Sequence, residues 1–244
     1  RDEEYIQEQS CRIGLKLRDN LYTAVLNLRK VEMPARASFY ELAQRFTELL
    51  PACCAFLYRN SIFMLIQSEE EIPDFAAYFA PIRPLMNEHY LTVGVSNPFH
   101  SLSDIQEHGF QSRKAQQLGT VMKPEECIYL YSDYSVYYMV ELCLKSESMD
   151  ALCVPELKKL LEYGQKEGGE FVETLRTYLR CGRSKSQTAR ELYVHLNTVK
   201  YRLSQIQSIM GLDLDNDDNA LKIMLSFKML EYSDHFPRTQ FLSR

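Results

Sequence analysis

The sequence of 244 residues lacks the short motifs by which many enzymes are recognised. A serine nucleophile elbow, a P-loop and a GxGxxG segment are all missing, which excludes the usual ways of activating a serine or holding a nucleotide phosphate. The five histidines do not stand at ligand spacing from a cysteine or an acidic residue. We therefore expect no catalytic residue, no metal site and no cofactor.

Long apolar runs and paired cysteines are missing as well. The chain has no run of about 18 apolar residues and no signal-peptide pattern, so neither a membrane span nor export is predicted. Its seven cysteines are odd in number and lack CxxC spacing, and most lie among apolar neighbours. This usage indicates a reducing compartment, the cytoplasm. Because the chain begins with Arg1 and not with Met, we expect a fragment of a longer protein.

The charges are distributed unevenly along the chain. A net charge of −5 argues against binding nucleic acid over the whole surface, but it leaves room for a local site. Acidic residues gather at positions 69–71 and 213–218. Seven cations lie between positions 176 and 202, opposed only by Glu191: Arg176, Arg180, Arg183, Lys185, Arg190, Lys200 and Arg202. One part of an acidic molecule is therefore cationic.

The first half of the chain alternates between strand and helix patterns. Strands are predicted at residues 21–28, 53–58, 62–67, 91–95 and 128–131, and helices at 2–19, 38–50, 74–90 and 105–119. Asn60 tolerates a positive φ and suits a hairpin turn at residues 59–60. This order predicts the α+β class, with a ferredoxin-like unit whose helices pack on one face of the sheet.

The segment SKSQTARELYVHLNTVKYRLSQI, residues 184–206, predicts two short helices joined by a tight turn. Before it, Phe171, Leu175, Tyr178 and Leu179 mark one face of another helix, after which Gly182 suits the left-handed position. Residues 184–187 fit a capping box, in which the serine hydroxyl and the glutamine side chain each bond an amide. Ala189 is small where two helices approach, and Leu192 and Val194 surround the turn. Together these features predict an all-α helix-turn-helix domain.

The second helix of this pair divides its residues between two sides. Val199, Leu203, Ile206 and Met210 form an apolar stripe for the core, and Asn197, Lys200, Tyr201 and Ser204 lie opposite, with His195 at the helix start. An amide can pair with adenine, and a lysine can reach guanine or phosphate. Arg183, Lys185, Ser186 and Gln187 stand at the start of the preceding helix, where phosphate is favoured. The alternative is a merely solvated face, but the cap, the tight turn and the cationic excess favour a DNA groove.

The same segment resembles the C-terminal helix-turn-helix of the PucR/CdaR family of bacterial transcriptional regulators. The similarity rests on ETLRTYL at 173–179, AREL at 189–192, VHLNT at 194–198 and YRL at 201–203, and it continues through GLDL at 211–214 and residues 220–230. The resemblance implies DNA-binding roles for His195, Asn197, Thr198, Tyr201 and Arg202. Leu196 replaces a common arginine, which removes a cation near the DNA. Tyr193 replaces a common glycine, which implies an altered turn.

Members of this family often carry a GGDEF-like domain before the DNA-binding domain, and residues 20–132 resemble it. The similarity lies in VGVSNPFH at 93–100, followed by Leu102 and Ile105. Active diguanylate cyclases place Gly-Gly-Asp-Glu-Phe at the central hairpin, where carboxylates hold Mg²⁺ against a triphosphate. Here the hairpin reads RNSIF at 59–63, which keeps only Phe63. We expect a degenerate domain without cyclase activity, kept for effector binding or dimerisation.

An acidic segment precedes the last predicted helix. Residues 213–218 alternate like a calcium loop, but Asp218 stands where a glycine is needed and Met224 where a glutamate is needed. We expect instead that Asn216 or Asp217 caps the helix that follows.

The sequence thus predicts five segments and one main function. The segments are a linker helix at 1–19, the α+β domain at 20–132, a helical connector at 133–168, the helix-turn-helix domain at 169–232 and a loose tail at 233–244. We predict a transcriptional regulator that reads the major groove of double-stranded DNA as a homodimer and responds to a small-molecule effector. The alternative is a nucleotide-binding, small-molecule-binding or protein-interaction module that uses the degenerate cyclase fold.

Overall fold

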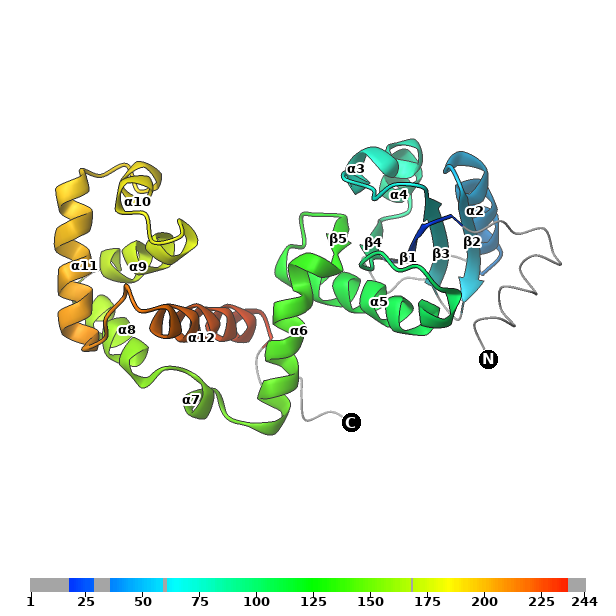
Figure 1. Cartoon of the computed structure of the whole chain (residues 1–244). Coiled ribbons are helices and arrows are strands. Elements are labelled where there is room, and N and C mark those ends of the chain that lie inside the picture. Colours follow the sequence, from blue (N-terminus) through cyan, green and yellow to red (C-terminus); the bar gives the residue numbers. More distant parts are fainter. Residues whose placement is uncertain (1–17, 29–35, 59–60, 168, 237–244) are drawn as a thin grey trace. The chain divides into compact units, whose positions relative to one another are not determined.

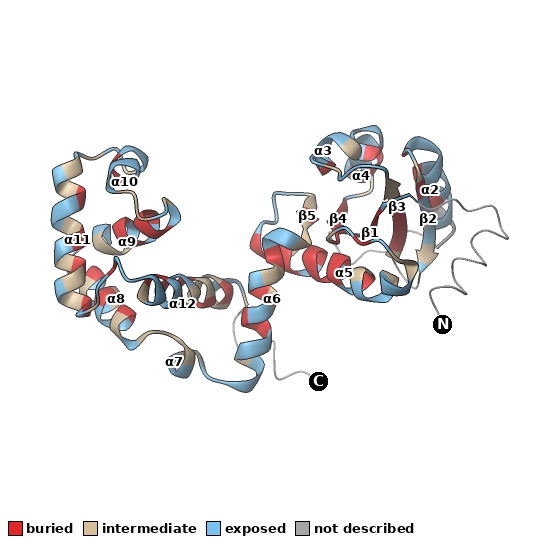
Figure 2. Cartoon of the chain, in the orientation of Figure 1, coloured by how far each residue is buried: buried red, intermediate tan, exposed pale blue. Residues whose placement is uncertain are grey.

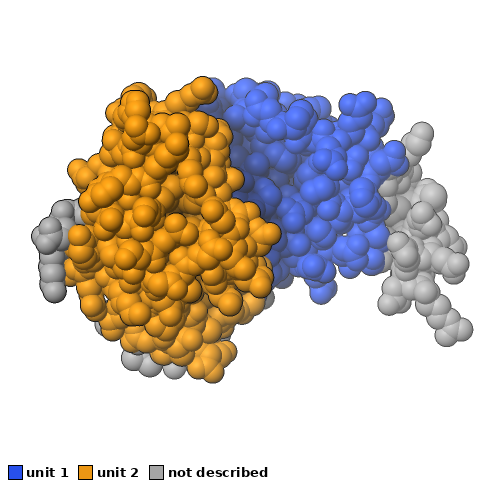
Figure 3. All heavy atoms as spheres, turned by 60° about the vertical axis from the view of Figure 1, so that its left-hand side comes forward, with its two compact units in different colours: residues 1–138 blue, residues 139–244 orange. Residues whose placement is uncertain are grey.

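The computed structural model describes residues 18–28, 36–58, 61–167 and 169–236. Two compact units divide the chain, residues 1–138 and 139–244 (Figure 3). Most of the predicted helix at 2–19, the hairpin turn at 59–60 and residues 237–244 of the predicted tail lie outside the described residues. Residues 233–235 were predicted to begin the loose tail, but they belong to the last helix, which ends at His235.

The first unit is built on a five-stranded sheet (Figure 1). Its strands are β1 (Asn20–Leu28), β2 (Cys53–Tyr58), β3 (Ser61–Ser68), β4 (Leu91–Val95) and β5 (Ile128–Leu130). The strand order is β2-β3-β1-β4-β5, with antiparallel pairs except for β4 and β5, which run parallel. The first four strands have the ferredoxin-like order and β5 extends the edge, so the predicted α+β class is confirmed.

Helices cover both faces of this sheet, and the prediction of one covered face is wrong. On one face Tyr22 and Ala24 of β1 pack in a core with α2 (Arg36–Leu49) and the segment 75–88. On the other face Thr23 donates a hydrogen bond of 2.6 Å to the carbonyl of His108 in α5 (Ile105–Met122). Buried residues follow the strands and one side of α5 (Figure 2). The physical reason lies in β1, whose nearly continuous apolar run suits a strand buried on both faces.

The predicted helix at 74–90 is broken into short pieces. Asp74 caps α3 (Phe75–Tyr78) by accepting hydrogen bonds from the amides of Ala76 and Ala77 at 2.8 and 3.2 Å. A 3₁₀ turn (Ala80–Ile82) and α4 (Arg83–Glu88) follow. Pro81 and Pro84 explain the break, because proline has no amide proton and suits only the first turn of a helix.

Helix α5 approaches the sheet so closely that one position of β4 has no room for a side chain. A Cβ atom on Gly94 would lie 2.0 Å from the carbonyl oxygen of Ser112 and 2.5 Å from the amide of Gln116. Gln116 also donates a hydrogen bond of 2.9 Å to the hydroxyl of Thr92. The helix and the strand therefore meet backbone to backbone.

The second unit is entirely helical in its described part. Its helices are the end of α6 (Tyr131–Ser146), α7 (Met149–Leu152), α8 (Pro155–Glu167), α9 (Glu170–Arg180), α10 (Lys185–Glu191), α11 (Leu196–Met210) and α12 (Asp217–His235). One core joins Leu157 and Leu160 of α8 with residues of α9, α11 and α12. Val154, before α8, donates its amide to the hydroxyl of Ser226 in α12 at 2.9 Å. Across the helices that the structure describes, none has the length and apolarity to cross a membrane.

The contact between α5 and β4 gives a first prediction. Gly94→Ala is expected to destabilise the first unit by about 3 kcal/mol, because the added methyl group would overlap the backbone of α5. Chemical unfolding followed by circular dichroism measures the change. Gly169→Ala is the control, since an added Cβ there meets nothing within 4 Å. Equal unfolding midpoints for the two variants would contradict the close approach.

Candidate nucleic-acid interface

The turn between α9 and α10 is a Schellman motif built on glycine. Gly182 has a φ of +59°, and its amide donates to the carbonyl of Leu179 at 3.2 Å. The amide of Arg183 donates to the carbonyl of Tyr178 at 2.9 Å. These two bonds satisfy carbonyls at the end of α9, and they confirm the left-handed position predicted for Gly182.

The first helix of the pair starts with half of the predicted capping box. The hydroxyl of Ser184 accepts a hydrogen bond of 3.3 Å from the amide of Gln187. The amide of Ser184 donates to the carbonyl of Cys181 at 3.1 Å, so the predicted return bond from the Gln187 side chain is wrong. The amide of Ser184 is already used in the tight turn after α9, so it is not available to the Gln187 side chain.

The turn between α10 and α11 has the same motif with a tyrosine in the place of glycine. The amide of Tyr193 donates to the carbonyl of Arg190 at 3.2 Å, and the amide of Val194 donates to the carbonyl of Ala189 at 3.0 Å. Tyr193 has a φ of +55°. The left-handed backbone is kept, and Tyr193 bears its strain.

Helix α11 has the two sides that its sequence predicts. Its buried residues are Val199, Leu203, Ile206 and Met210, which confirms the apolar stripe. At its start the Nδ1 atom of His195 accepts a hydrogen bond of 3.2 Å from the amide of Asn197. The helix thus begins with a histidine cap and holds its inner side by packing.

The candidate base-contacting residues lie together on and beside the outer side of α11. His195, Asn197, Lys200, Tyr201 and Ser204 are exposed, and Thr198 is half-buried. At the start of α10, Lys185, Ser186 and Gln187 are exposed as well. Amides, hydroxyls and two ammonium groups are therefore exposed on two neighbouring helices, and these groups can hydrogen-bond base edges and phosphates.

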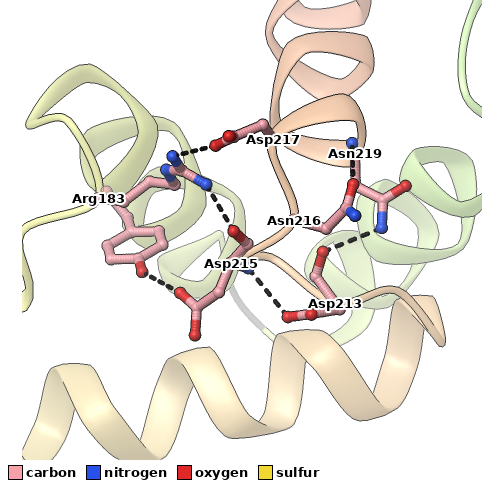
Figure 4. Close-up of polar contacts among 7 residues, drawn as sticks. Arg183, Asp213, Asp215, Asn216, Asp217 and Asn219 are labelled. Carbon is pink, nitrogen blue, oxygen red and sulfur yellow. Dashed lines mark hydrogen bonds and ion pairs between the residues drawn. The ribbon is translucent and has the colours of Figure 1, made fainter.

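Three of the seven cations in this region are held inside the second unit. Arg183 donates to the carbonyl of Asp215 at 2.7 Å and pairs with the carboxylate of Asp217 (Figure 4). Arg202 pairs with the carboxylate of Glu170. The guanidinium of Arg176 lies 4.9 Å from the centre of the Phe227 ring. Arg180, Lys185, Arg190 and Lys200 are exposed and lie outside these three contacts, and Arg176 is exposed as well although it packs on Phe227.

Sequence reasoning missed the internal roles of Arg183 and Arg202. Their partners lie 34 and 32 residues away in the chain. The available signal was the acidic segment at 213–218, whose charge complements that of Arg183.

That acidic segment connects the ends of three helices through short polar contacts (Figure 4). Asp215 accepts a hydrogen bond of 2.9 Å from the hydroxyl of Tyr178 in α9. Asp213 accepts the amide of Asp215 at 3.0 Å, and its carbonyl accepts the side chain of Asn219 at 3.0 Å. Asn216 caps α12 by accepting the amide of Asn219 at 3.0 Å, which confirms the predicted cap.

In the first unit, Phe63 of the former cyclase motif serves the core. Its ring lies 5.2 Å from the ring of Phe56, and a Cβ on Gly109 would lie 3.1 Å from it. Neighbouring residues 59–60 are outside the described part. The described residues contain no group of three or more histidine, cysteine or acidic side chains that could hold a metal ion.

Comparison with known proteins gives a match to each unit. Residues 171–229 match the PucR C-terminal helix-turn-helix domain, and residues 1–118 match the GGDEF-like domain.

Three curated relatives illustrate the similarity. The chain is 29% identical over 139 residues to the purine catabolism regulatory protein of Bacillus subtilis, covering 57% of the chain and 26% of that protein. It is 23% identical over 195 residues to the DNA-binding transcriptional activator AdeR of the same organism, covering 76% of the chain and 46% of AdeR. It is 25% identical over 141 residues to the carbohydrate diacid regulator of Escherichia coli, covering 57% and 35%. The chain thus spans less than half the length of each.

These matches define the domain class of the chain: a GGDEF-like region followed by a helix-turn-helix domain of the PucR C-terminal type. More narrowly, the chain is similar to the purine catabolism regulatory protein and the carbohydrate diacid regulator, the similarity that its motifs predicted. The names of the relatives are those of regulators, in agreement with the expectation that the chain is not an enzyme.

The contact between Tyr178 and Asp215 predicts a pH dependence. Burial raises the pKa of Tyr178 from 10 to about 12, and the hydrogen bond to Asp215 and the charge of that carboxylate act in the same direction. The folded state holds this proton more tightly than the unfolded chain. The stability that it contributes is complete below pH 10 and is lost as the pH rises through about 12.

We expect Tyr178→Phe to reduce the loss of stability of the second unit between pH 10 and 12. Thermal unfolding at a series of pH values measures the effect. Tyr201→Phe is the matched control, because it removes an exposed hydroxyl from the same unit. If Tyr178→Phe and the parent chain lose stability in parallel, the proposed contribution of this hydroxyl is wrong.

Proposed function

We propose that the chain binds double-stranded DNA by placing α11 in the major groove. The observation that carries this proposal is the division of α11 into a buried apolar side and an exposed polar side, at the end of a capped helix pair. In this motif the second helix enters the major groove and the first crosses the sugar-phosphate backbone. Relatives named as regulators and as a DNA-binding activator support the same function.

The outer side of α11 supplies the proposed base contacts. Asn197 can pair with adenine through its amide, and Lys200 can reach guanine. His195, Thr198, Tyr201 and Ser204 lie on the same side of the helix or beside it. His195 uses Nδ1 for the helix cap, so Nε2 is the atom available to DNA.

Phosphate contacts are assigned to the start of α10. Lys185, Ser186 and Gln187 are exposed there and carry a cation, a hydroxyl and an amide. Arg183 and Arg202 were expected to make phosphate contacts, but they pair with Asp217 and Glu170. We infer that these two arginines position the helices and that DNA does not require them to change partners.

The proposal also covers the oligomeric state of the chain and the role of its first unit. A single helix-turn-helix makes few base contacts, so we propose a homodimer on paired half-sites. Two relatives are named for purine catabolism and for carbohydrate diacids, which supports control by a small molecule. The GGDEF-like domain at 20–132 would bind that effector or the second subunit, joined by the connector at 133–168 to the DNA-binding domain at 169–232. The proposed location is the cytoplasm, where bacterial DNA lies.

Base recognition is tested by Asn197→Ala and Lys200→Ala. Each variant should bind an operator selected from random-sequence DNA about 5- to 150-fold more weakly, because a good base contact contributes about 1–3 kcal/mol. Selectivity should relax at the base pair that the lost side chain contacts. Gel-shift titrations with the operator and its single-base-pair variants measure both effects. Unchanged affinity and selectivity in both variants would falsify the assignment of α11.

Phosphate binding is tested by Lys185→Ala. The variant should bind all duplex sequences more weakly by a similar factor, and the slope of log affinity against log salt should fall by about 1. Lys222→Ala, which removes an exposed lysine from α12, is the control for the loss of one charge.

Calorimetry with purine nucleotides tests the alternative function: nucleotide binding by a chain that binds no duplex DNA would favour a binding module over a regulator.

A further inference from the structure

Tyr193 is the most exposed of the large hydrophobic residues in the described part of the chain. It occupies the turn between α10 and α11 with 96% of its surface accessible. Within the described residues its hydroxyl makes no hydrogen bond and its ring makes no aromatic contact. Neither packing nor bonding inside the protein therefore explains a tyrosine at this position.

The backbone makes this residue more unusual. Tyr193 has a φ of +55°, a left-handed conformation that glycine adopts freely and that a bulky residue adopts at a cost. The turn after α9 provides an internal comparison, because it has the same motif and places Gly182 at the equivalent position with a φ of +59°. A strained residue persists where its side chain has a use.

The position of the turn indicates what that use is. Tyr193 stands two residues before His195, the residue that caps the start of α11. In a docked helix-turn-helix the start of the second helix contacts the bases, so the residues just before it lie near the edge of the groove. Arg190 and Lys200 are exposed on the flanking helices, so the local charge favours an anion. Tyrosine hydroxyl groups commonly donate hydrogen bonds to the phosphate oxygens of DNA.

We propose that the hydroxyl of Tyr193 binds a phosphate of the DNA backbone at the edge of the groove that α11 enters. This inference rests on the proposed function and adds a contact to it. The phenol is neutral, so the contact fixes the position of the domain on the duplex without adding to the salt dependence. The aromatic side chain has few rotatable bonds and therefore loses little entropy when it binds.

Two substitutions in the full chain test the contact. Tyr193→Phe keeps the ring and the backbone strain but removes the hydroxyl, and Tyr193→Gly removes the side chain and the strain. Both should bind mixed-sequence duplex DNA roughly 3- to 10-fold more weakly, the range expected for one lost hydrogen bond. The salt slope should stay that of the parent, in contrast to Lys185→Ala. Tyr193→Gly should also unfold at a higher temperature than the parent, because glycine relieves the left-handed strain.

The outcomes separate this inference from the proposed function. Parent-like affinity of both variants, with Lys200→Ala still impaired, overturns the contact and leaves the function standing. Parent-like affinity together with loss of transcriptional activation also overturns it and assigns the tyrosine to a protein partner. A parent chain that binds no duplex DNA at low salt overturns the function itself. Weaker binding by Tyr193→Gly alone shows that the ring matters and not the hydroxyl, which rejects the phosphate bond.

Discussion

The second unit depends on the burial of one apolar stripe, the four residues Val199, Leu203, Ile206 and Met210 of α11. Each is at most 3% exposed, and burying such a side chain contributes about 1.5–3 kcal/mol. This packing fixes the rotation of the helix about its own axis. Because the side chains of an α-helix have fixed angular positions, the opposite side is then fixed as well. The orientation of every candidate DNA contact on α11 therefore follows from a hydrophobic constraint.

Charge in this unit has two separate uses. Three guanidinium groups contact the Glu170 and Asp217 carboxylates and the Phe227 ring and thereby connect helices of the unit. The lysines of α10 and α11 remain exposed. Arg180 and Arg190 are exposed with them, so only the three contacting arginines make use of the planar, directional contacts of a guanidinium group. The electrostatic attraction for DNA is accordingly weaker than the seven cations in the sequence suggest.

Local sequence patterns predicted the helices and strands of this protein well, but they did not predict its long-range contacts. The stripe on α11, the left-handed Gly182 and the Asn216 cap each depend on residues a few positions apart, so spacing was sufficient. The break in the predicted helix at 74–90 also has a local cause, Pro81 and Pro84. The prediction followed the helical spacing of the apolar residues and gave these two prolines too little weight. The covered second face of the sheet and the arginine pairs depend on residues brought together by the fold. Their sequence separation leaves no periodic signal.

The loop between α11 and α12 has a consequence for how this protein can be divided. Asp215 of this loop supplies a carbonyl acceptor for Arg183 and a carboxylate acceptor for Tyr178. Helix α12 adds the Asp217 carboxylate for Arg183 and places Ile223 and Phe227 in the same core as α8 and α9. A fragment that ended after α11 would leave a guanidinium unpaired and expose the apolar ends of two helices. The helix-turn-helix therefore shares its core and its polar contacts with the helices on either side of it in the sequence. A fragment that keeps this core whole would have to extend from α8 into the second half of α12.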